Sequence, residues 1–368
     1  MQVEPQAHLP EEDLRGLLTQ LDGVGTTGES CWQGWSISRI GGGWCNLLFR
    51  ATRAGSDLAV KFTMREARDR AGRREEAGLM TYDPVCQDPP SLDPAHPATM
   101  AELCFDCCGC RVNGVLYVAQ GAGPHPTVVL LHGFPGNERN FDLAQVLRRA
   151  GWNVLVFHYR GNWGSEGDYS LAHVLEDAGS ALAFLRSEEA CDAYRVDRER
   201  LVLIGHSLGG FAALMIAADD SDVRAAASVA GINIAVWAKG VGEARRANAL
   251  QMFEGALSRL HGTSAEALLD EMLLQGDTWD LRGLAPALVD RPVLLVAATR
   301  DEGLPLTDHH EPLVEAMEKA GARHLTAVVL ESDHGFNDRR IALSRTILDW
   351  LDSLPGAPAG RAGEPGPG

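Results

Sequence analysis

The stretch LVLIGHSLGG, residues 201–210, decides the fold of this chain. Its apolar start is typical of a buried strand, the pattern G-x-S-x-G follows directly, and the small apolar run at 211–217 is compatible with a helix. Strand, sharp turn and helix in that order predict a strained turn that presents Ser207 at the carboxyl end of a parallel sheet. Glycine fits at 205 and 209 because a side chain would collide where strand and helix cross. An ordinary glycine-rich turn is the alternative, and the match of both flanks disfavours it.

Two further polar residues follow later predicted strands, in the order acid and then histidine. Asp301 comes after the apolar run 292–298, and His334 comes after the run 324–330. Serine, acid and histidine occur in this order in folds that carry such a turn. We interpret His334 as the base that takes the proton of Ser207, and Asp301 as the acid that holds its imidazole in one tautomer. Rival acids near the same strand ends are Glu302, Asp308 and Asp333.

An earlier strand end supplies the electrophilic half of the predicted site. The apolar strand 127–131 is followed by HGFPG at 132–136. Acyl transfer requires two fixed N–H groups directed at the developing oxyanion. One is the amide of Leu208, directly after the nucleophile. The other comes from the 132–136 loop, where Phe134 fits because Pro135 has no N–H.

Strands and helical patterns alternate over about 101–354, which predicts an α/β fold with a doubly wound, mostly parallel sheet. With the motifs above, YRGNWGSEG at 159–167 and VDRER at 196–200, residues 101–353 resemble the α/β-hydrolase superfamily. The resemblance is to its branch of acyl-aminoacyl peptidases, prolyl oligopeptidases and dienelactone-hydrolase-like esterases. It implies an acyl-enzyme on Ser207, because the similar dehalogenase and epoxide-hydrolase branches use aspartate. The β-propeller of true oligopeptidases has no room before the hydrolase, which favours an esterase.

Residues 232–290 do not fit the alternation of strands and helices. They carry helical patterns over 235–260 and 264–275, and in the resembled fold an insertion here lies over the nucleophile as a cap. Its apolar side chains either pack the cap onto the body or line an acyl or aryl pocket, since such pockets are mostly apolar. The pocket candidates are Trp163, Trp237, Met252 and Phe253.

Residues 1–80 are expected to form a separate α+β unit. Strands are predicted on both sides of the glycine-rich turn at 40–46 and again at 58–62, before a charged helix over 65–80. The unit resembles the N-terminal lobe of aminoglycoside phosphotransferases and protein kinases, which implies that Lys61 faces nucleotide phosphates and pairs with Glu75. The catalytic and metal-binding aspartates of that family do not follow, so no phosphoryl transfer is expected. The unit is then expected to be a remnant, an oligomerisation or docking module, or at most a weak nucleotide binder.

Composition predicts a water-soluble enzyme. The chain has 368 residues, 45% apolar content and a formal net charge of −17, which suit a large buried sheet and disfavour nucleic acid and anionic membranes as partners. No apolar run reaches the length of a membrane span, and the start lacks the basic and apolar regions of a signal peptide, so a cytoplasmic location is expected. Proline-rich residues 81–100 are expected to be a linker, and 355–368 a disordered tail.

Cysteines cluster in CFDCCGC at 104–110, a pattern that raises the question of zinc. The segment is predicted to be a strand entering a hairpin, so alternate residues face opposite sides, and no second Cys/His pair lies nearby at structural-zinc spacing. We therefore expect no metal, no cofactor and reduced thiols. Three histidines, His125, His158 and His173, are interpreted as surface or loop residues.

The sequence thus predicts a serine hydrolase that cleaves small-molecule carboxylic esters, with small amides or acyl-peptides as a secondary class. An acyltransferase using the same acyl-enzyme stays open, as does a non-catalytic nucleotide-binding or docking role of the first unit. A homo-oligomer is compatible with the sequence.

Overall fold

The computed structural model describes the strands at 29–32, 35–41, 46–53 and 56–63, and residues 82–239 and 242–358. The chain forms two compact units, Met1–Gly78 and Leu79–Gly368. The helix expected over 65–80, with Glu75, lies outside the described residues, and so do residues 359–368 of the expected tail.

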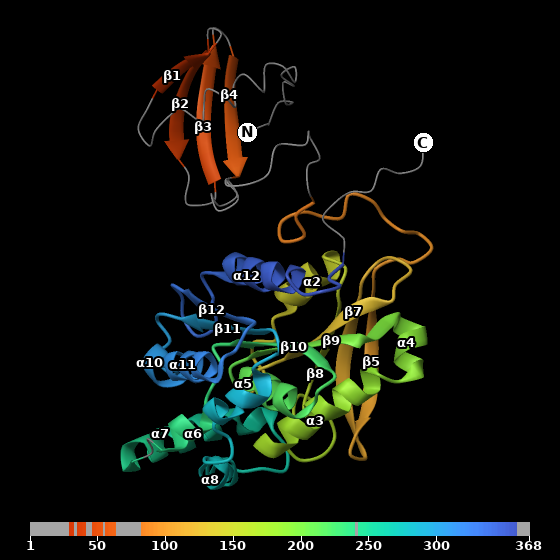
Figure 1. Cartoon of the computed structure of the whole chain (residues 1–368), viewed down its shortest axis with the longest axis vertical. Coiled ribbons are helices and arrows are strands. Elements are labelled where there is room, and N and C mark those ends of the chain that lie inside the picture. The colour runs from red at the N-terminus through yellow and green to blue at the C-terminus, as the bar shows by residue number, and fades with distance from the viewer. Residues whose placement is uncertain are drawn as a thin grey trace. The chain divides into compact units, whose positions relative to one another are not determined.

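The first unit contains a four-stranded antiparallel sheet in the order β1-β2-β3-β4 (Figure 1). Its strands are β1 (Glu29–Trp32), β2 (Trp35–Gly41), β3 (Asn46–Arg53) and β4 (Ser56–Thr63). The strands expected on both sides of the glycine-rich turn and at 58–62 are present, and β1 was not predicted. Lys61 lies on β4 opposite Leu48 of β3. The similarity to a phosphotransferase lobe stays a prediction.

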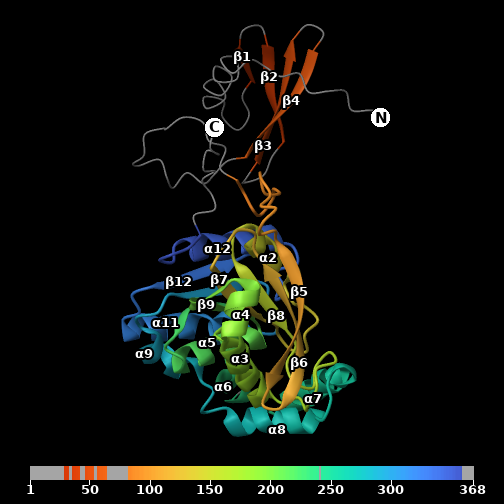
Figure 2. The same cartoon turned by 90° about the vertical axis from the view of Figure 1, so that its right-hand side faces the viewer.

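The second unit is built on an eight-stranded sheet in the order β12-β11-β10-β9-β7-β8-β6-β5 (Figures 1 and 2). Strands β5 (Thr99–Cys107) and β6 (Cys110–Val118) form an antiparallel hairpin, and β6 pairs antiparallel with β8. All other neighbours are parallel, which confirms the predicted mostly parallel sheet. These strands are β7 (His125–Leu131), β8 (Asn153–Phe157), β9 (Val196–His206), β10 (Val223–Val229), β11 (Val293–Ala298) and β12 (Leu325–Leu330).

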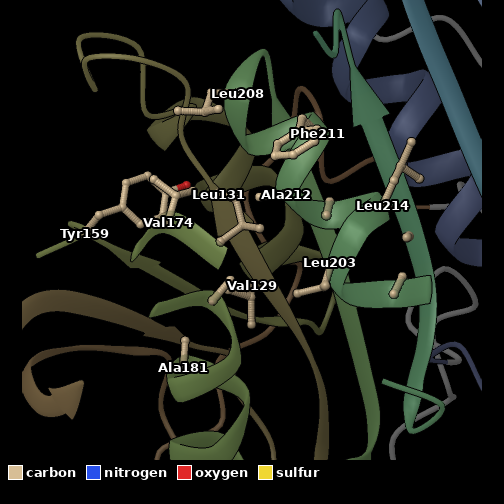
Figure 3. Packing of buried hydrophobic residues seen from close by; sticks show 14 of the residues in the cluster. Val129, Leu131, Tyr159, Val174, Ala181, Leu203, Leu208, Phe211, Ala212 and Leu214 are labelled. Atoms are coloured by element: carbon tan, nitrogen blue, oxygen red, sulfur yellow. The ribbon is translucent and has the colours of Figure 1, made fainter. Parts of the chain in front are cut away.

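Helices cover both faces of this sheet, because the central strands are apolar on both sides. Along β7, Val128 and Leu130 belong to one core, whereas Val129 and Leu131 belong to the other. The first core is closed by α2 (Phe141–Arg149) and α12 (Arg340–Asp352). The second is closed by α3 (Leu171–Leu185), α5 (Leu208–Asp219) and α11 (Glu311–Ala320). Figure 3 shows side chains of α3 and α5 packed onto β7 and β9. Two short helices are α4 (Glu188–Tyr194) and α10 (Leu306–His309).

The insertion between β10 and β11 is helical, as the sequence predicts. It contains α6 (Ile234–Lys239), α7 (Glu243–Ala256), α8 (Ala265–Gln275), α9 (Ala285–Leu288) and two 3₁₀ turns, Leu257–Arg259 and Leu281–Leu284. This cap is tied to the body through Glu271 of α8, whose carboxylate accepts hydrogen bonds from the amides of Leu171 and Ala172 at 2.8 Å. Those amides begin α3 and have no partner within their own helix.

The start of the proline-rich stretch expected to be a linker makes specific contacts with the second unit, while most of residues 86–100 are exposed. Asp83 forms an ion pair with Arg345 of α12 at 2.6 Å, and Nε of Arg149 donates to the Pro84 carbonyl at 2.8 Å. Proline lacks an N–H but keeps a carbonyl that a neighbouring arginine can use. These contacts hold the start of the predicted linker on the second unit. Within the described part of the chain, no helix has the length and apolar character needed to span a bilayer.

Candidate active site

Ser207 lies at the junction of β9 and α5 in a strained conformation. Its backbone angles are φ 58° and ψ −116°. A positive φ is strained for a residue with a side chain and persists only where the surrounding structure enforces it. The Ser207 amide donates to the carbonyl of Val229 in β10 at 2.9 Å, and the Ile232 amide donates to the Ser207 carbonyl at 3.3 Å. These bonds hold the turn on the neighbouring strand.

Two glycines make this turn sterically feasible. A Cβ at Gly205 would overlap the Gly209 carbonyl, and a Cβ at Gly209 would overlap the Leu131 carbonyl of β7. The predicted collision at the crossing of strand and helix is therefore confirmed. Behind the turn, Leu208 and Phe211 of α5 are buried in the core that Figure 3 shows.

Asp301 and His334 form a hydrogen-bonded pair at the ends of the parallel neighbours β11 and β12. Nδ1 of His334 lies 2.5 Å from Oδ2 of Asp301. Oδ1 of Asp301 accepts from the amides of Gly303 at 3.1 Å and Leu304 at 2.9 Å. Burial alone would raise the pKa of Asp301, but His334 and these amides hold it below its usual value. Since an ionised carboxylate only accepts, Nδ1 carries the imidazole proton and Nε2 is left as the basic nitrogen.

The rival acids have other surroundings. Asp333 accepts from the amide and side chain of Asn337 at 2.9 and 2.8 Å. Asp308 accepts from the Thr307 hydroxyl at 3.1 Å, and Glu302 is exposed. The carboxylate in contact with His334 is therefore that of Asp301.

His206 connects the loop of His334 to the strand that carries Ser207. Its Nε2 lies 2.8 Å from the His334 carbonyl, and the two ring centroids are 4.8 Å apart. Burial and the charge that His334 can carry lower the pKa of His206 to about 4. On the other side of the loop, Arg340 donates to the Gly335 carbonyl at 3.1 Å. The sequence analysis did not identify His206, which occupies a variable position of G-x-S-x-G.

The loop at 132–136 lies beside Ser207. A Cβ at Gly133 would be 2.8 Å from Cβ of Ser207 and 3.4 Å from its Oγ. Phe134, one of the two predicted oxyanion donors, follows Gly133 directly. The other, Leu208, is the first residue of α5, so its N–H has no carbonyl partner within the helix.

Aromatic side chains donate hydrogen bonds to carbonyl groups of this loop. Nδ1 of His132 donates to the Gly133 carbonyl at 2.8 Å, and Nε1 of Trp163 donates to the Pro135 carbonyl at 2.9 Å. The guanidinium of Arg139 lies 5.0 Å from the Trp163 ring centre and donates to Nε2 of His158 at 3.3 Å. Trp163, predicted as a pocket residue, is thus part of the support of the loop.

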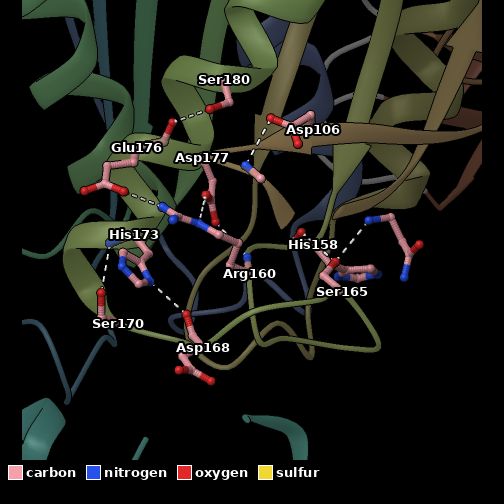
Figure 4. Close-up of polar contacts among 12 residues, drawn as sticks. Asp106, His158, Arg160, Ser165, Asp168, Ser170, His173, Glu176, Asp177 and Ser180 are labelled. Atoms are coloured by element: carbon pink, nitrogen blue, oxygen red, sulfur yellow. Dashed lines mark hydrogen bonds and ion pairs between the residues drawn. The ribbon is translucent and has the colours of Figure 1, made fainter. Parts of the chain in front are cut away.

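The histidines interpreted as surface or loop residues differ from one another. His125 is 8% exposed at the start of β7, so its interpretation is wrong; its Nε2 donates to the Gly121 carbonyl at 3.1 Å. His158 does lie in a loop, but burial and nearby Arg139 lower its pKa to about 4. His173, in the first turn of α3, is half-buried and contacts the Asp168 carbonyl (Figure 4).

The other pocket candidates lie on the cap at different depths. Phe253 of α7 is buried, and its ring stands perpendicular to that of Phe134 with 5.3 Å between centroids. Trp237 of α6 is half-buried against the core, whereas Met252 is 52% exposed. Phe253 is the candidate that brings the cap into contact with the predicted oxyanion loop.

A buried ion pair fixes the segment between β8 and α3. Nε of Arg160 lies 2.5 Å from Oδ1 of Asp177, and the Arg160 amide donates to Oδ2 at 2.7 Å (Figure 4). Arg160 also contacts Glu176 at 2.5 Å. This segment carries Trp163, so the pair indirectly supports the loop at 132–136. The sequence analysis did not find it.

The cysteine cluster does not form a metal site within the described residues, where no group of three or more His, Cys, Asp or Glu side chains is arranged to hold an ion. Cys107 is buried and lies opposite Cys110 across the tip of the hairpin, whereas Cys104 and Cys108 are exposed. These four cysteines, with Cys86 and Cys191, are free thiols.

Known proteins resemble this chain in its second unit. A model of the alpha/beta hydrolase family matches residues 128–344. The uncharacterized protein YfhR of Escherichia coli K12 is 34% identical over 107 residues, 28% of this chain and 36% of YfhR. The quorum-quenching protein AidA of Acinetobacter baumannii is 30% identical over 138 residues, 36% of this chain and 44% of AidA. The chain therefore matches less than half the length of either relative.

Solved structures share the fold at low sequence identity. An esterase of Pyrococcus furiosus superposes with a TM-score of 0.54 at 15% identity, covering 73% of this chain and 98% of that one. The 2,6-dihydroxy-pseudo-oxynicotine hydrolase gives 0.53 at 20% identity, covering 74% and 71%. The acylaminoacyl peptidase of Pyrococcus horikoshii gives 0.54 at 13% identity, covering 93% and 50%.

Proposed function

Because the chain belongs to the alpha/beta hydrolase family, we propose that it is a serine hydrolase that cleaves carboxylic esters through an acyl-enzyme on Ser207. The family and fold support a hydrolase, and the finer assignment rests on the site. The observation that carries it is the 2.5 Å contact between His334 and Asp301, in a loop joined by His206 to the strained turn of Ser207.

In the first half of the proposed reaction, Oγ of Ser207 attacks the ester carbonyl carbon while Nε2 of His334 takes the hydroxyl proton. The carbonyl electron pair moves onto oxygen, where the amides of Phe134 and Leu208 would stabilise the negative charge. The tetrahedral intermediate then collapses. The bond to the alkoxy oxygen breaks, and His334 gives its proton to the departing alcohol.

In the second half, water attacks the acyl carbon and passes a proton to His334. Collapse of this intermediate releases the carboxylic acid and returns the proton to Oγ of Ser207, so that ester and water yield acid and alcohol. Asp301 holds the Nδ1–H tautomer and stabilises the imidazolium formed in each half.

The surroundings of Phe134 favour esters with apolar acyl or aryl groups. Its ring contacts Phe253 at 5.3 Å and Tyr169 at 6.0 Å between centroids. Both of these rings are buried, so the partly exposed ring of Phe134 is the aromatic surface open to a substrate. An apolar surface suits such substrates better than a peptide backbone, which needs hydrogen-bond partners. Small amides and acyl-peptides stay a secondary class.

Labelling with a fluorophosphonate probe tests the nucleophile. Wild-type protein should be labelled, while Ser207→Ala should not be labelled and should lose about a million-fold in kcat on p-nitrophenyl esters. Ser180→Ala, on α3, is the matched control and should behave as wild type. Labelling that persists in Ser207→Ala would exclude the proposal. Transfer of the acyl group to an added alcohol or amine in preference to water would identify an acyltransferase that uses the same acyl-enzyme.

A further inference from the structure

We propose that His206 is a positioning residue that fixes the base His334 relative to the nucleophile Ser207. This inference rests on the proposed function, because it assigns His206 a role in the same reaction. His206 is the last residue of β9 and directly precedes Ser207. Its Nε2 lies 2.8 Å from the carbonyl oxygen of His334.

The chemistry of this contact defines the tautomer of His206. A backbone carbonyl only accepts, so Nε2 must carry the proton and donate it. The ring is buried, at 6% exposure, and Nδ1 has no partner among the described residues. Among the described residues, the His206 ring therefore makes its polar contact with the loop that carries His334.

The bond shortens the structural route between base and nucleophile. His334 follows the edge strand β12, whereas Ser207 follows β9, and two strands, β11 and β10, lie between them. Without a direct contact, the separation of Oγ and Nε2 would depend on three successive strand pairings. His206 joins the two ends directly.

Two other contacts of the loop have different effects. Asp301 binds Nδ1 of His334 and so controls the tautomer and rotation of its ring. Arg340 binds the Gly335 carbonyl from α12. His206 holds the carbonyl of His334 itself, which places the residue from which the catalytic ring extends.

His125 is a matched control for a purely structural role. It is also buried, at 8% exposure, and its Nε2 also donates to a backbone carbonyl, that of Gly121. His125 lies at the amino end of β7, the parallel neighbour of β9, whereas Ser207 follows the carboxyl end of β9. The two residues are therefore at opposite ends of the strands. Loss of either bond should affect stability, but only loss of the His206 bond should affect the reaction.

The test compares His206→Leu, His206→Gln, His206→Asn and His125→Leu in the full chain. The measurements are kcat and KM on p-nitrophenyl acetate, the rate of fluorophosphonate labelling, and the thermal midpoint. We expect His206→Leu to lower kcat and the labelling rate roughly 10- to 100-fold, with KM within a few-fold, because small displacements of reacting groups are costly. His206→Gln, whose amide nitrogen can take the place of Nε2, should recover most of the loss, and the shorter His206→Asn should not. His125→Leu should lower the midpoint and leave kcat unchanged.

A His206→Leu enzyme with wild-type kcat would overturn the inference. If that variant does not fold, the pair His206→Gln and His206→Asn decides, and equal kcat for the two would overturn it. Failure of the proposed function gives a different result, because wild-type protein would then not be labelled at Ser207.

Discussion

Gly133 and Ser207 approach each other so closely that a Cβ at Gly133 would lie 2.8 Å from Cβ of Ser207. The Cβ added at Gly133 would also lie 3.1 Å from the backbone carbonyl oxygen of His206, so a methyl group has no space at this position. The loop at 132–136 and the turn of Ser207 are therefore in direct steric contact.

We expect Gly133→Ala to fold but to lose activity. The methyl group must displace either the Ser207 side chain or the loop that carries the Phe134 amide, and loss of one oxyanion donor typically costs about 10²- to 10³-fold in kcat. The measurement is kcat on p-nitrophenyl acetate. Gly179→Ala is the control: a Cβ there meets nothing within 4 Å, so kcat should be unchanged and stability should rise by about 0.5–1 kcal/mol in this helix interior. Wild-type kcat in Gly133→Ala would show that the loop adapts.

Asp301→Asn should lower kcat by about four orders of magnitude, because an amide cannot hold the Nδ1–H tautomer of His334 as a carboxylate does. Asp333→Asn removes a neighbouring carboxylate whose contacts are with Asn337, and it should keep kcat within a few-fold. Steady-state kinetics of both variants distinguish the acids. The reverse ranking would move the acid to Asp333.

Asp177→Asn should destabilise the second unit strongly. The side chains of Arg160 and Asp177 are 7% and 0% exposed, so the substitution leaves the positive charge of Arg160 buried without its main negative partner. Breaking a buried ion pair costs about 3–5 kcal/mol. We expect a loss near the lower end, because Glu176 still contacts Arg160. Glu166→Gln breaks an ion pair with Arg111 whose side chains are 49% and 72% exposed, and it should cost at most about 1 kcal/mol. Denaturant unfolding measures both, and equal losses would contradict the assignment of the buried pair.

Stability should fall as the pH drops from 6.5 toward 5. Burial is the main cause that lowers the pKa of His132 to about 3 and those of His158 and His206 to about 4, whereas an unfolded chain binds these protons at about 6.5. Acid therefore favours the unfolded state, by up to about 1.4 kcal/mol per pH unit for each such ring. His158→Gln should reduce the slope by one such increment, and exposed His324→Gln serves as the control. An unchanged slope in His158→Gln would show that its ring is already protonated in the folded protein.

Removal of residues 1–78 should leave the hydrolase unit folded with kcat within a few-fold, since the proposed chemistry lies between Phe134 and His334. Removal of residues 1–97 should cost a further 1–3 kcal/mol, approximately, because it takes away the partner of Arg345 and a carbonyl acceptor of Arg149. Thermal unfolding of the two truncated chains measures the difference. Equal midpoints would indicate that residues 82–97 contribute little to stability.

The strands and the order of the candidate triad were predictable because each depends on local sequence. Strand β11 is a continuous apolar run, and β7 and β9 contain such runs at 128–131 and 201–204, as expected for strands buried on both faces. Ser207 follows β9 directly, and Asp301 and His334 lie in the loops after β11 and β12. The seven-residue helix α4 was missed because it has little apolar periodicity: Ala190 is its buried residue, and its start is marked by the Ser187 side chain accepting from the Ala190 amide.

Other features depend on contacts between distant segments. Arg160 and Asp177 look like ordinary surface charges until the chain folds and buries both. The base loop reaches His206 over 128 positions of sequence, and no pattern around residue 206 announces that contact. The contacts of Asp83 and Pro84 were not predictable for the same reason, since their partners Arg345 and Arg149 lie on distant helices.

The position of the cap has an evolutionary consequence. Strands β10 and β11 are in register from Ala226 opposite Val293 to Val229 opposite Val296, so the chain between them adds helices without adding to the sheet. Selection can therefore exchange or lengthen this insertion while the strands that carry Ser207, Asp301 and His334 are inherited unchanged. A recombined cap would need to reproduce two junctions, the ring of Phe253 against Phe134 and the carboxylate of Glu271 at the start of α3. On the proposed function, substrate preference and bond cleavage would then be encoded in separable parts of one gene.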